Sequence, residues 1–463
     1  MQIVIRNAND GIAIKKLGII ATNYDAQFSG NFECSEPILN KVWEVGRHTI
    51  LMCAQDGWID CPGRESRQWL GDGIVMFDMA NLAFGPSIFP MHKEFLKQIC
   101  EGQRQDGLAR MVSPGDIRLN SITIPDYSFH WIIGLYNYWM ASGDLETVED
   151  SMPNIELCLK WFANYRDENG LIADVPEWHF IEWANIDRKG YSMAFNALYA
   201  GALNAASIMN KALGNTKKSK ILDDEYNLVC YSLNQLHFNH SKNIYVDSVD
   251  DKSHAQGDRV SQHANALSIL YNVAPKNIHD NVLNNIIDDS RLKLTDAPPI
   301  MANCDEFNEN IDIVRANSFF AHFVYDAIAK AGKIDWVIND IIKLFGPMIA
   351  TGTTTLWEAF EPIASLCHGF SATPLYQLSR HCLGIKAIDA GYKKFTFDLS
   401  HNQLLWAKGV IPTIHGDIIV SWKKNGERIN VSIRHPLDCE FVLNQNAQYQ
   451  MIKNENGFIE LSF

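Results

Sequence analysis

Residues 57–73, GWIDCPGRESRQWLGDG, concentrate charged and aromatic side chains between two apolar stretches of the chain. The side chains here that could do chemistry are Asp60, Arg64, Glu65, Trp69 and Asp72. A segment of this composition typically lines a site, because loops carry binding and catalytic residues more often than other elements do. The alternative is a knot of surface ion pairs, which are common and contribute little to stability. The composition alone leaves both interpretations open.

A second group of candidates lies in residues 351–362, TGTTTLWEAFEP, and in residues 366–374, LCHGFSATP. Glu358 follows Trp357 here, after a run of threonines that is too polar for a simple core helix. A carboxylate beside aromatic rings is typical of a sugar site, since ring faces stack on pyranose C–H groups and carboxylates bind hydroxyl groups. A helix start with an acidic residue in its first turn would give the same pattern. Glu361 is a weaker candidate, because the proline after it places it at the end of an element.

Two carboxyl groups are the usual machinery of a glycoside hydrolase, in which one acts as general acid and the other as nucleophile or base. The acid needs a raised pKa, which apolar or like-charged neighbours favour and arginines oppose. Glu65 has neighbours of both kinds along the chain, namely Asp60 and Asp72 as well as two arginines. Sequence position by itself therefore does not decide whether Glu65 serves as an acid.

Composition and charge argue against several classes of function. The chain has 463 residues and a formal net charge of −14, without a basic stretch that could neutralise phosphates, so no nucleic-acid partner is expected. No apolar run approaches the length that crosses a bilayer, and the first residues lack the pattern of a secretory signal. The 10 cysteines are scattered singly, without CxxC pairs or metal-ligand spacing. We therefore expect free thiols in a reducing compartment, a cytoplasmic location, and no membrane or metal.

The middle of the chain, from about residue 35 to 385, predicts helices almost throughout. Apolar residues recur at spacings of three and four in stretches such as PILNKVWEVGRHTILMCA, YSFHWIIGLYNYWMASG and YSMAFNALYAGALNAASIMNKALG. About twelve such stretches follow one another, and several end at glycine or asparagine as helix C-caps do. Twelve helices without a heptad repeat suggest six helical hairpins closed into a toroid, although the count also fits an irregular helical domain.

Both ends of the chain have the period of β-strands. From about residue 386, apolar residues alternate in KKFTFDLS, LLWAKGVIPT, GDIIVSWKKNGERINVSIR and FIELSF, and KKNGER predicts a hairpin turn. These segments predict a small antiparallel β-sandwich. Residues 1–31 carry IVIRN and AIKKLGII, which predict strands or extended chain. The predicted organisation is an N-terminal segment at 1–31, a helical barrel at 32–385 and a β-sandwich at 386–463.

Residues 57–73 also resemble the signature of bacterial α-L-rhamnosidases, glycoside hydrolase family 78, in which a DCP tripeptide precedes an Arg–Glu pair, a Trp and a Gly–Asp. The matching residues, in the same order and spacing, are Asp60-Cys61-Pro62, Arg64-Glu65, Trp69 and Gly71-Asp72. FECSEPILNKVWEVGRHTI resembles the opening helix of the family's catalytic domain, TTTLWEAF its TTxWE segment, and LLWAKGVIPTIHGDIIVSWK its C-terminal sandwich. The resemblance covers nearly the whole chain.

The resemblance implies a mainly α fold, an (α/α)6 barrel with a C-terminal antiparallel β-sandwich, and release of terminal α-L-rhamnose with inversion and without a cofactor. It implies that Glu65 is the general acid and Glu358 the general base. The residues that it places around the sugar are Asp60, Arg64, Trp69, Asp72, Trp131, Trp178, Trp183, Trp357 and His368. For His368 the alternative is a core residue, which is the more common place for a lone histidine near an apolar run.

Inversion sets a geometric requirement on the two glutamates. The acid protonates the leaving oxygen while the base activates a water on the opposite face of the ring, so the carboxyls should lie roughly 6.5–9.5 Å apart. Two departures from the family are visible. Family members are commonly longer, with β-sandwich domains before the barrel, of which residues 1–31 resemble only the last strands. Glu182, in EWHFIEWANIDRKG, stands where some relatives carry a shorter Asp.

Other functions fit parts of the same pattern. A six-hairpin glycosidase acting on another deoxy or uronic sugar would keep both glutamates and change the aromatic pocket. A non-catalytic carbohydrate-binding relative is a second alternative, against which the presence of both glutamates argues. A polysaccharide lyase would need a Tyr or His base beside a group that neutralises a uronate, which the DCP-RE-W-GD spacing does not suggest. The expected partner is a carbohydrate, and the sequence leaves its linkage, its leaving group and the oligomeric state open.

Overall fold

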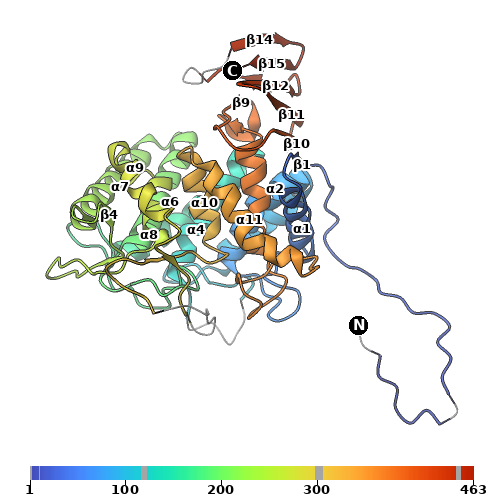
Figure 1. The fold of residues 1–463 in the computed structure, drawn as a ribbon. Coiled ribbons are helices and arrows are strands. Elements are labelled where there is room, and N and C mark those ends of the chain that lie inside the picture. The colour runs from blue at the N-terminus through green and yellow to red at the C-terminus, as the bar shows by residue number, and fades with distance from the viewer. Residues whose placement is uncertain (1–2, 10, 116–121, 298–305, 445–449, 463) are drawn as a thin grey trace.

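The computed structural model describes residues 3–9, 11–115, 122–297, 306–444 and 450–462. A helical domain forms the main body, and a β-sheet region stands at one end of it (Figure 1). The N-terminal segment leads away from this body before the first strand begins.

All the helices that the sequence predicted are present among the described residues. They are α1 Pro37–Cys53, α2 Leu70–Phe84, α3 Phe89–Gly102, α4 Pro125–Ser142, α5 Leu145–Ala163, α6 Met193–Ala212, α7 Thr216–Leu236, α8 Gln262–Leu270, α9 His279–Ile286, α10 Ala321–Lys330, α11 Ile334–Ala350 and α12 Thr373–Gln377. The short helical turns are η1 Gly85–Ile88, η3 Lys276–Ile278, η4 Gly369–Ala372, η6 Ala390–Tyr392 and the π-helical turn η5 Leu378–Cys382, which continues α12.

The even-numbered helices form a closed inner ring. Each of α2, α4, α6, α8, α10 and α12 contacts the next, and α12 contacts α2. The odd-numbered helices pack outside them, α7 against α6 and α11 against α10 for example. Burial follows the same division, since α6 is buried on almost all sides whereas α7 buries only a few residues. The predicted toroid of six helical hairpins is therefore confirmed.

The connections between hairpins differ in length at the two ends of the ring. Those that lead into the inner helices are long, and their described residues are 54–69, 103–115 with 122–124, 164–192, 237–261, 287–297 with 306–320, and 351–372. Those that lead out of them are shorter, and Gly143, with a φ of 72°, ends α4 in the left-handed conformation that glycine adopts without strain. Because the long connections precede the N-terminal ends of the inner helices, they gather at one mouth of the ring.

The C-terminal region contains two sheets. The larger has the order β1-β10-β11-β12-β15-β14 and is antiparallel, with β1 Asn31–Cys34, β10 Trp406–Thr413, β11 Gly416–Asn425, β12 Arg428–Arg434, β14 Gln450–Glu455 and β15 Phe458–Ser462. The smaller has the order β13-β9-β8, with β8 Ile385–Ala387, β9 Lys394–Phe397 and β13 Glu440–Phe441. In the predicted hairpin Asn425 pairs with Arg428, and Gly426 has a φ of 65°.

Among the described residues, three short strand pairs form within the long connections of the helical domain. They are β2 Tyr191–Ser192 with β5 Ser248–Val249, β3 Phe238–Asn239 with β4 Ile244–Tyr245, and β6 Leu292–Lys293 with β7 Ile313–Val314.

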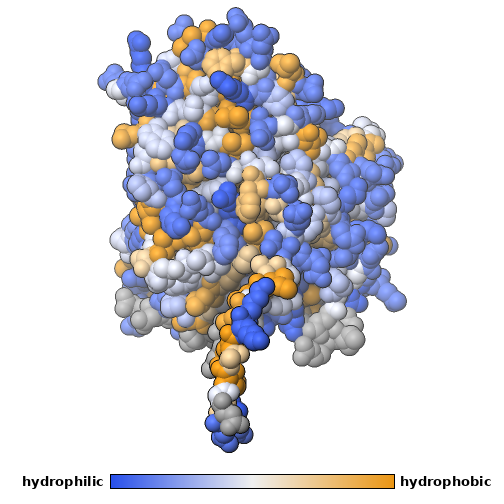
Figure 2. All heavy atoms as spheres, turned by 90° about the vertical axis from the view of Figure 1, so that its right-hand side faces the viewer, coloured by the Kyte–Doolittle hydropathy of each residue, from blue (hydrophilic) through white to orange (hydrophobic). Residues whose placement is uncertain are grey.

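The larger sheet combines a strand that precedes the helical domain with strands that follow it. Strand β1 pairs with β10 from Asn31 opposite Val410 to Cys34 opposite Ala407, so the sheet includes residues from outside 386–463. The described residues before β1 contain no strand, and they are extended and largely exposed. Figure 2 shows this segment projecting from the body with hydrophobic side chains along it, and its exposed apolar residues include Ile5, Ile12, Leu17 and Ile20.

One stretch of the described residues, Leu70–Gly102, is long and apolar enough to cross a membrane by length and composition alone. It comprises α2, η1 and α3, and 72% of its most apolar window is buried inside the protein. Its apolar side chains therefore serve the core of the helical ring.

Candidate active site

Residues from two distant parts of the sequence meet at the mouth formed by the N-terminal ends of the inner helices. The connection before α2 carries Asp60, Arg64 and Glu65, and the connection before α12 carries Glu358 and His368. Arg64 contacts Glu358 directly, which places the two connections face to face. The closed ring of helices anchors both ends of each connection, so loops of irregular structure can hold side chains in fixed positions.

The start of α2 depends on a glycine. Trp69 precedes the helix, and Asp72 lies in its first turn. A Cβ at Gly71 would lie 2.4 Å from the ring of Tyr127, so only glycine lets that ring pack here. The Tyr127 hydroxyl lies 3.5 Å from Oδ2 of Asp72 and donates to it. The Gly71-Asp72 pair of the motif thus fixes the position of a buried acid.

Arg64 connects the two candidate catalytic glutamates. One Nη group pairs with Glu65, and the other lies 2.6 Å from Oε2 of Glu358. Its Nε donates to the Ser365 hydroxyl at 3.3 Å, and the indole N–H of Trp69 donates to the other oxygen of Glu65 at 2.8 Å. The Arg64 side chain is 50% exposed whereas that of Glu358 is 3% exposed, so the guanidinium enters the mouth from the solvent side. The two carboxylates therefore face one shared cation.

Glu358 is buried and ionised. Burial raises the pKa of this carboxyl, but hydrogen bonding and charge from His368, the Ser365 N–H at 3.0 Å and the charge of Arg64 outweigh burial and lower the pKa to about 2. The backbone is also fixed, since its N–H donates to the Ser365 carbonyl at 2.8 Å and the Ser318 hydroxyl donates to its carbonyl oxygen. An ionised carboxylate in a fixed orientation has the properties of a general base.

His368 lies between two acids. Its Nε2 is 3.1 Å from Oδ1 of Asp72, and its Nδ1 is 3.5 Å from Oε2 of Glu358. Burial alone would lower the pKa of His368, but hydrogen bonding to Asp72 and then to other neighbours, Glu358 among them, raises it well above its ordinary value. Burial also raises the pKa of Asp72, and His368 offsets part of that rise. The position of His368 between these acids thus favours the ionised form of Glu358.

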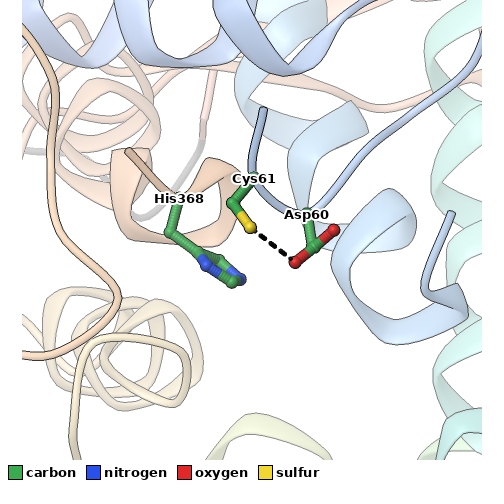
Figure 3. Close-up of side chains that lie close together, drawn as sticks. All are labelled: Asp60, Cys61 and His368. Atoms are coloured by element: carbon green, nitrogen blue, oxygen red, sulfur yellow. Dashed lines mark hydrogen bonds between the residues drawn. The ribbon is translucent and has the colours of Figure 1, made fainter. Parts of the chain in front are cut away.

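Asp60, Cys61 and His368 form a compact cluster beside these acids (Figure 3). The Cys61 thiol donates to Asp60 at 3.0 Å, and burial, followed by the charge of Asp72, raises the pKa of Asp60. The possible ligand atoms of the three side chains lie within 4.8 Å of one another, and these residue types could hold a metal ion. In the structure, however, the Cys61 thiol donates to Asp60 and the Nε2 of His368 contacts Asp72, so two of the three possible ligands already have other partners. Catalysis without a metal or cofactor stays a prediction.

Aromatic rings lead from the acids along one side of the mouth. Trp178 and Trp183 are half-buried with ring centroids 6.0 Å apart, and the ring of Phe180 contacts them at 5.4 and 4.9 Å. Phe180 also lies 5.9 Å from Tyr127, whose hydroxyl reaches Asp72. This series of contacts places both predicted tryptophans in the wall beside the acids, where partly exposed ring faces can pack on a sugar.

Two predicted tryptophans lie deeper. Trp357 is 7% exposed, and its indole N–H donates to the Thr353 hydroxyl at 3.4 Å. Trp131 is 0% exposed and packs in the helical core, because α4 is buried on almost all sides of its axis. The structure therefore does not bring Trp131 to the mouth, contrary to the implied sugar contact, and it leaves only a small edge of Trp357 accessible.

The structure adds residues that sequence analysis did not single out. Ser365 binds both Glu358 and Arg64 and gave no recognisable signal. The ring of Phe370 lies 4.0 Å from that of His368 and 5.3 Å from that of Phe319. Tyr127, Phe319 and Phe370 all stand at or just before the start of an inner helix. Inspection of the first turn of each predicted helix would have found them.

Comparisons with known proteins agree with this geometry. The family model described as bacterial alpha-L-rhamnosidase 6 hairpin glycosidase domain matches residues 27–296, and that of the bacterial alpha-L-rhamnosidase C-terminal domain matches residues 384–458. The chain is 24% identical to an alpha-L-rhamnosidase of Formosa agariphila over 96% of this chain and 47% of that protein. It is 22% identical to an alpha-L-rhamnosidase of Alteromonas sp. over 94% of this chain and 46% of that protein. The chain thus spans about half the length of the curated relatives it matches.

Solved structures share the fold. The family 78 rhamnosidase of Bacillus sp. GL1 matches with a TM-score of 0.79 and 25% identity, covering 91% of this chain and 43% of that one. The Streptomyces avermitilis alpha-L-rhamnosidase complexed with L-rhamnose matches with a TM-score of 0.72 and 17% identity, covering 95% of this chain and 41% of that one. The helical ring, the sheet beside it and the family models that match both lead to one conclusion. This chain belongs to the bacterial α-L-rhamnosidase family of six-hairpin glycosidases.

Proposed function

We propose that the chain is an inverting glycoside hydrolase that releases terminal α-L-rhamnose from glycosides or oligosaccharides. The observation that carries the proposal is the pairing of Glu65 and Glu358 across the Arg64 guanidinium, with Glu358 ionised at the mouth of the ring. The curated relatives are named alpha-L-rhamnosidases, and one structure of the same fold holds L-rhamnose. Because the chain spans about half the length of those relatives, the main support for its activity and substrate is the geometry of its own site.

In the proposed reaction the two glutamates divide the proton transfers. Glu65 gives a proton to the leaving oxygen as the C1–O bond breaks, while Glu358 takes a proton from a water whose oxygen bonds to C1 on the opposite face. Return of a proton from Glu358 to Glu65 through solvent restores the site. One guanidinium contacts both carboxylates through separate Nη groups, so a sugar whose leaving oxygen approaches Glu65 has to displace Arg64 from Glu65, while the hydrogen bond from Arg64 to Glu358 can stay.

The remaining candidates have roles that follow from their contacts. Asp60 and Asp72 are buried acids that can accept hydrogen bonds from sugar hydroxyls, and His368 keeps Glu358 ionised. Trp178 and Trp183 offer ring faces to the apolar side of a deoxy sugar such as rhamnose. An acidic site with one apolar wall suits a neutral sugar that carries both hydroxyl groups and a methyl group.

Two substrates with different leaving groups distinguish the role of the general acid from that of the general base. The full chain would be assayed on p-nitrophenyl α-L-rhamnopyranoside, whose good leaving group departs with little protonation of its oxygen. It would also be assayed on methyl α-L-rhamnopyranoside, whose poor leaving group has to be protonated. Glu358→Gln should lower kcat about 10²–10⁴-fold on both substrates. Glu65→Gln should lower it far more on the methyl glycoside. Glu361→Gln, a neighbouring glutamate without a role in the site, is the matched control.

The configuration of the product tests inversion, and the choice of substrate tests the assignment of rhamnose. Proton NMR of the first product should show β-L-rhamnose, because inversion changes the anomeric configuration. Retained α-configuration would replace inversion by a covalent mechanism. A well-folded protein that cleaves neither rhamnoside would leave the family membership intact but end the assignment of rhamnose as substrate, and other deoxy or uronic glycosides would then be tested.

We also propose a cytoplasmic location. The support is the single, scattered occurrence of the cysteines and the absence of disulfides among the described residues, whose cysteines are free. Fractionation of the native source with antibody detection would test it, and recovery of the protein in a secreted or periplasmic fraction would contradict it.

A further inference from the structure

A cavity of about 390 Å³ lies at the opposite mouth of the ring, away from the candidate active site. The C-terminal halves of the inner helices line it, together with Ala387 and Tyr392 from the link to the β-sheet region. Ile208 and Lys330 at its edge are exposed, so solvent reaches it. Its size is in the range of pockets that hold small molecules. We call it the far-mouth cavity.

The far-mouth cavity presents polar groups that have no protein partner. Arg380 lines it, and its guanidinium makes no hydrogen bond or ion pair with any described residue, although its Nε is buried. Within the described ranges, the side-chain amide of Asn204 and the hydroxyls of Tyr136, Tyr271 and Tyr376 also make no hydrogen bond. The Nε of Arg380 is therefore a buried donor without an acceptor. Because buried polar groups are normally satisfied, such a donor beside a cavity indicates a ligand that supplies an acceptor, to which the other polar groups can add hydrogen bonds.

The charges around the far-mouth cavity favour a neutral ligand. Asp78 accepts from Asn137 at 3.1 Å and lies 3.4 Å from His322, and Asp326 pairs with Lys330 at 2.8 Å. The acids are therefore already partnered. The inner helices direct their C-terminal ends here, and the partial negative charge of those ends opposes an anion. The positive charge of the Arg380 guanidinium would repel a cationic ligand.

Two unusual backbone features position side chains in the wall of the far-mouth cavity. Arg380 stands on the π-helical turn η5, a conformation that is rare and often found at functional sites. Tyr392 has a φ of 61° and is 4% exposed, although a bulky side chain rarely adopts the left-handed region. Such conformations cost free energy, and they are found mainly where function requires the position of a side chain.

We propose that the far-mouth cavity is a second carbohydrate-binding site, which takes a neutral polyhydroxy ligand of monosaccharide size. The Arg380 guanidinium donates to hydroxyl oxygens of the ligand, Asn204 both donates and accepts, and the tyrosine rings pack on its C–H faces. Neither Glu65 nor Glu358 lines this cavity, so binding at this second site can be tested independently of the proposed hydrolase activity.

The test measures binding of D-glucose and D-galactose to the full chain by saturation-transfer NMR and calorimetry, with D-glucuronate and D-glucosamine as charged analogues of similar size. The neutral sugars should bind, and Arg380→Met should weaken them about tenfold or more, because it removes the unpaired donors. Asn204→Leu keeps the shape of the side chain and the charge of the cavity but removes the donors and the acceptor of the amide, and it should have the same effect. Glu358→Gln, at the other mouth, should leave this binding unchanged.

Three results would overturn the proposal. The first is the absence of binding by both neutral sugars at ~50 mM, a concentration that would reveal even a weak site. The second is binding that persists in folded Arg380→Met and Asn204→Leu but disappears in Glu358→Gln, which would place the sugar in the candidate active site. The third is tighter binding of D-glucuronate or D-glucosamine than of the neutral sugars, which would assign the cavity to a charged ligand.

Discussion

At the scale of single residues, the candidate site depends on how Arg64 and His368 are placed among three acids. Arg64 spans Glu65 and Glu358, and His368 lies between Glu358 and Asp72. His368 is buried and cannot move away, whereas Arg64 is half-exposed and can. His368 therefore favours the ionised form of the proposed base Glu358, and Arg64 can release Glu65 while it keeps its hydrogen bond to Glu358.

Replacement of His368 should shift the pH dependence of the reaction. His368→Asn removes the largest interaction that opposes burial, so the pKa of Glu358 should rise from about 2 toward its ordinary 4.5. Glu358 must be ionised to act as base, so activity should be lost at a higher pH as the solution is acidified. The acidic limb of kcat/KM against pH measures this shift, with far-UV circular dichroism as the check on folding. An unchanged acidic limb would mean that another group sets it.

Replacement of Arg64 should weaken catalysis without unfolding the protein. Arg64→Met removes a charged hydrogen bond to Glu358 worth roughly 1.5–3 kcal/mol, which corresponds to about 10–100-fold in kcat/KM. Arg64→Lys keeps the charge but cannot reach two carboxylates with a planar fork, so its activity should lie between the two. Steady-state kinetics on the p-nitrophenyl rhamnoside measure both. Equal activity of all three proteins would remove Arg64 from the mechanism.

At the scale of elements, one buried carboxylate ties the aromatic wall to two helices. Glu182 accepts from His263 of α8 at 2.6 Å, and from the backbone N–H groups of Asn317 at 2.7 Å and Phe320 at 2.6 Å. It adjoins Trp183 in the connection before α6. A longer Glu at this position therefore lets one side chain reach both α8 and the turn before α10.

Removal of this carboxylate should destabilise the fold and loosen the wall. Glu182→Ala leaves three buried donors without an acceptor, each at a cost of roughly 1–3 kcal/mol. A lower Tm and a higher KM for the rhamnoside should follow, and Glu182→Asp should recover part of both. Glu168→Ala, an exposed glutamate, is the control for thermal unfolding. A Tm for Glu182→Ala equal to that of the control would contradict the bracing role.

At the scale of the whole molecule, strand β1 joins the helical domain to the β-sheet region. Phe32 and Cys34 of β1 are each 2% exposed, and β1 covers the edge of β10. The residues before it are mostly exposed, with their first backbone contact from Tyr24 to Ala54 at 2.8 Å. The sheet region is therefore held to the barrel by chain segments from both sides.

Two truncations should separate the exposed segment from the strand. Deletion of residues 1–22 should change the free energy of unfolding by no more than about 0.5 kcal/mol, since it removes exposed residues. Deletion of residues 1–34 also removes the buried Phe32, worth roughly 1.5–3 kcal/mol, and uncovers a sheet edge that can pair with other chains. Thermal unfolding and light scattering measure the two effects. Equal Tm values for both truncations would show that β1 does not stabilise the sheet.

The sequence by itself determined the elements of this protein and the motif at its mouth. The outer helices bury one face with a period of 3.6, the inner helices are apolar on most sides, and the predicted C-terminal strands alternate with period two, so local spacing was enough to predict all twelve helices and the successive strands. The spacing from Asp60 to Asp72 was likewise recognisable, because those residues are close in the chain.

Only the tertiary structure decided which distant residues meet. Closure of the helical ring brings residues 57–73 against residues 351–369, so that Arg64 reaches Glu358 and His368 reaches Asp72. The tertiary structure also places Trp131 in the core, pairs β1 with β10, and leaves the buried Nε of Arg380 without a hydrogen-bond partner beside the far-mouth cavity. The periodicity of apolar residues indicates which face of an element is buried. It does not indicate which other element packs against that face, because this depends on contacts between residues that can be hundreds of positions apart in the sequence.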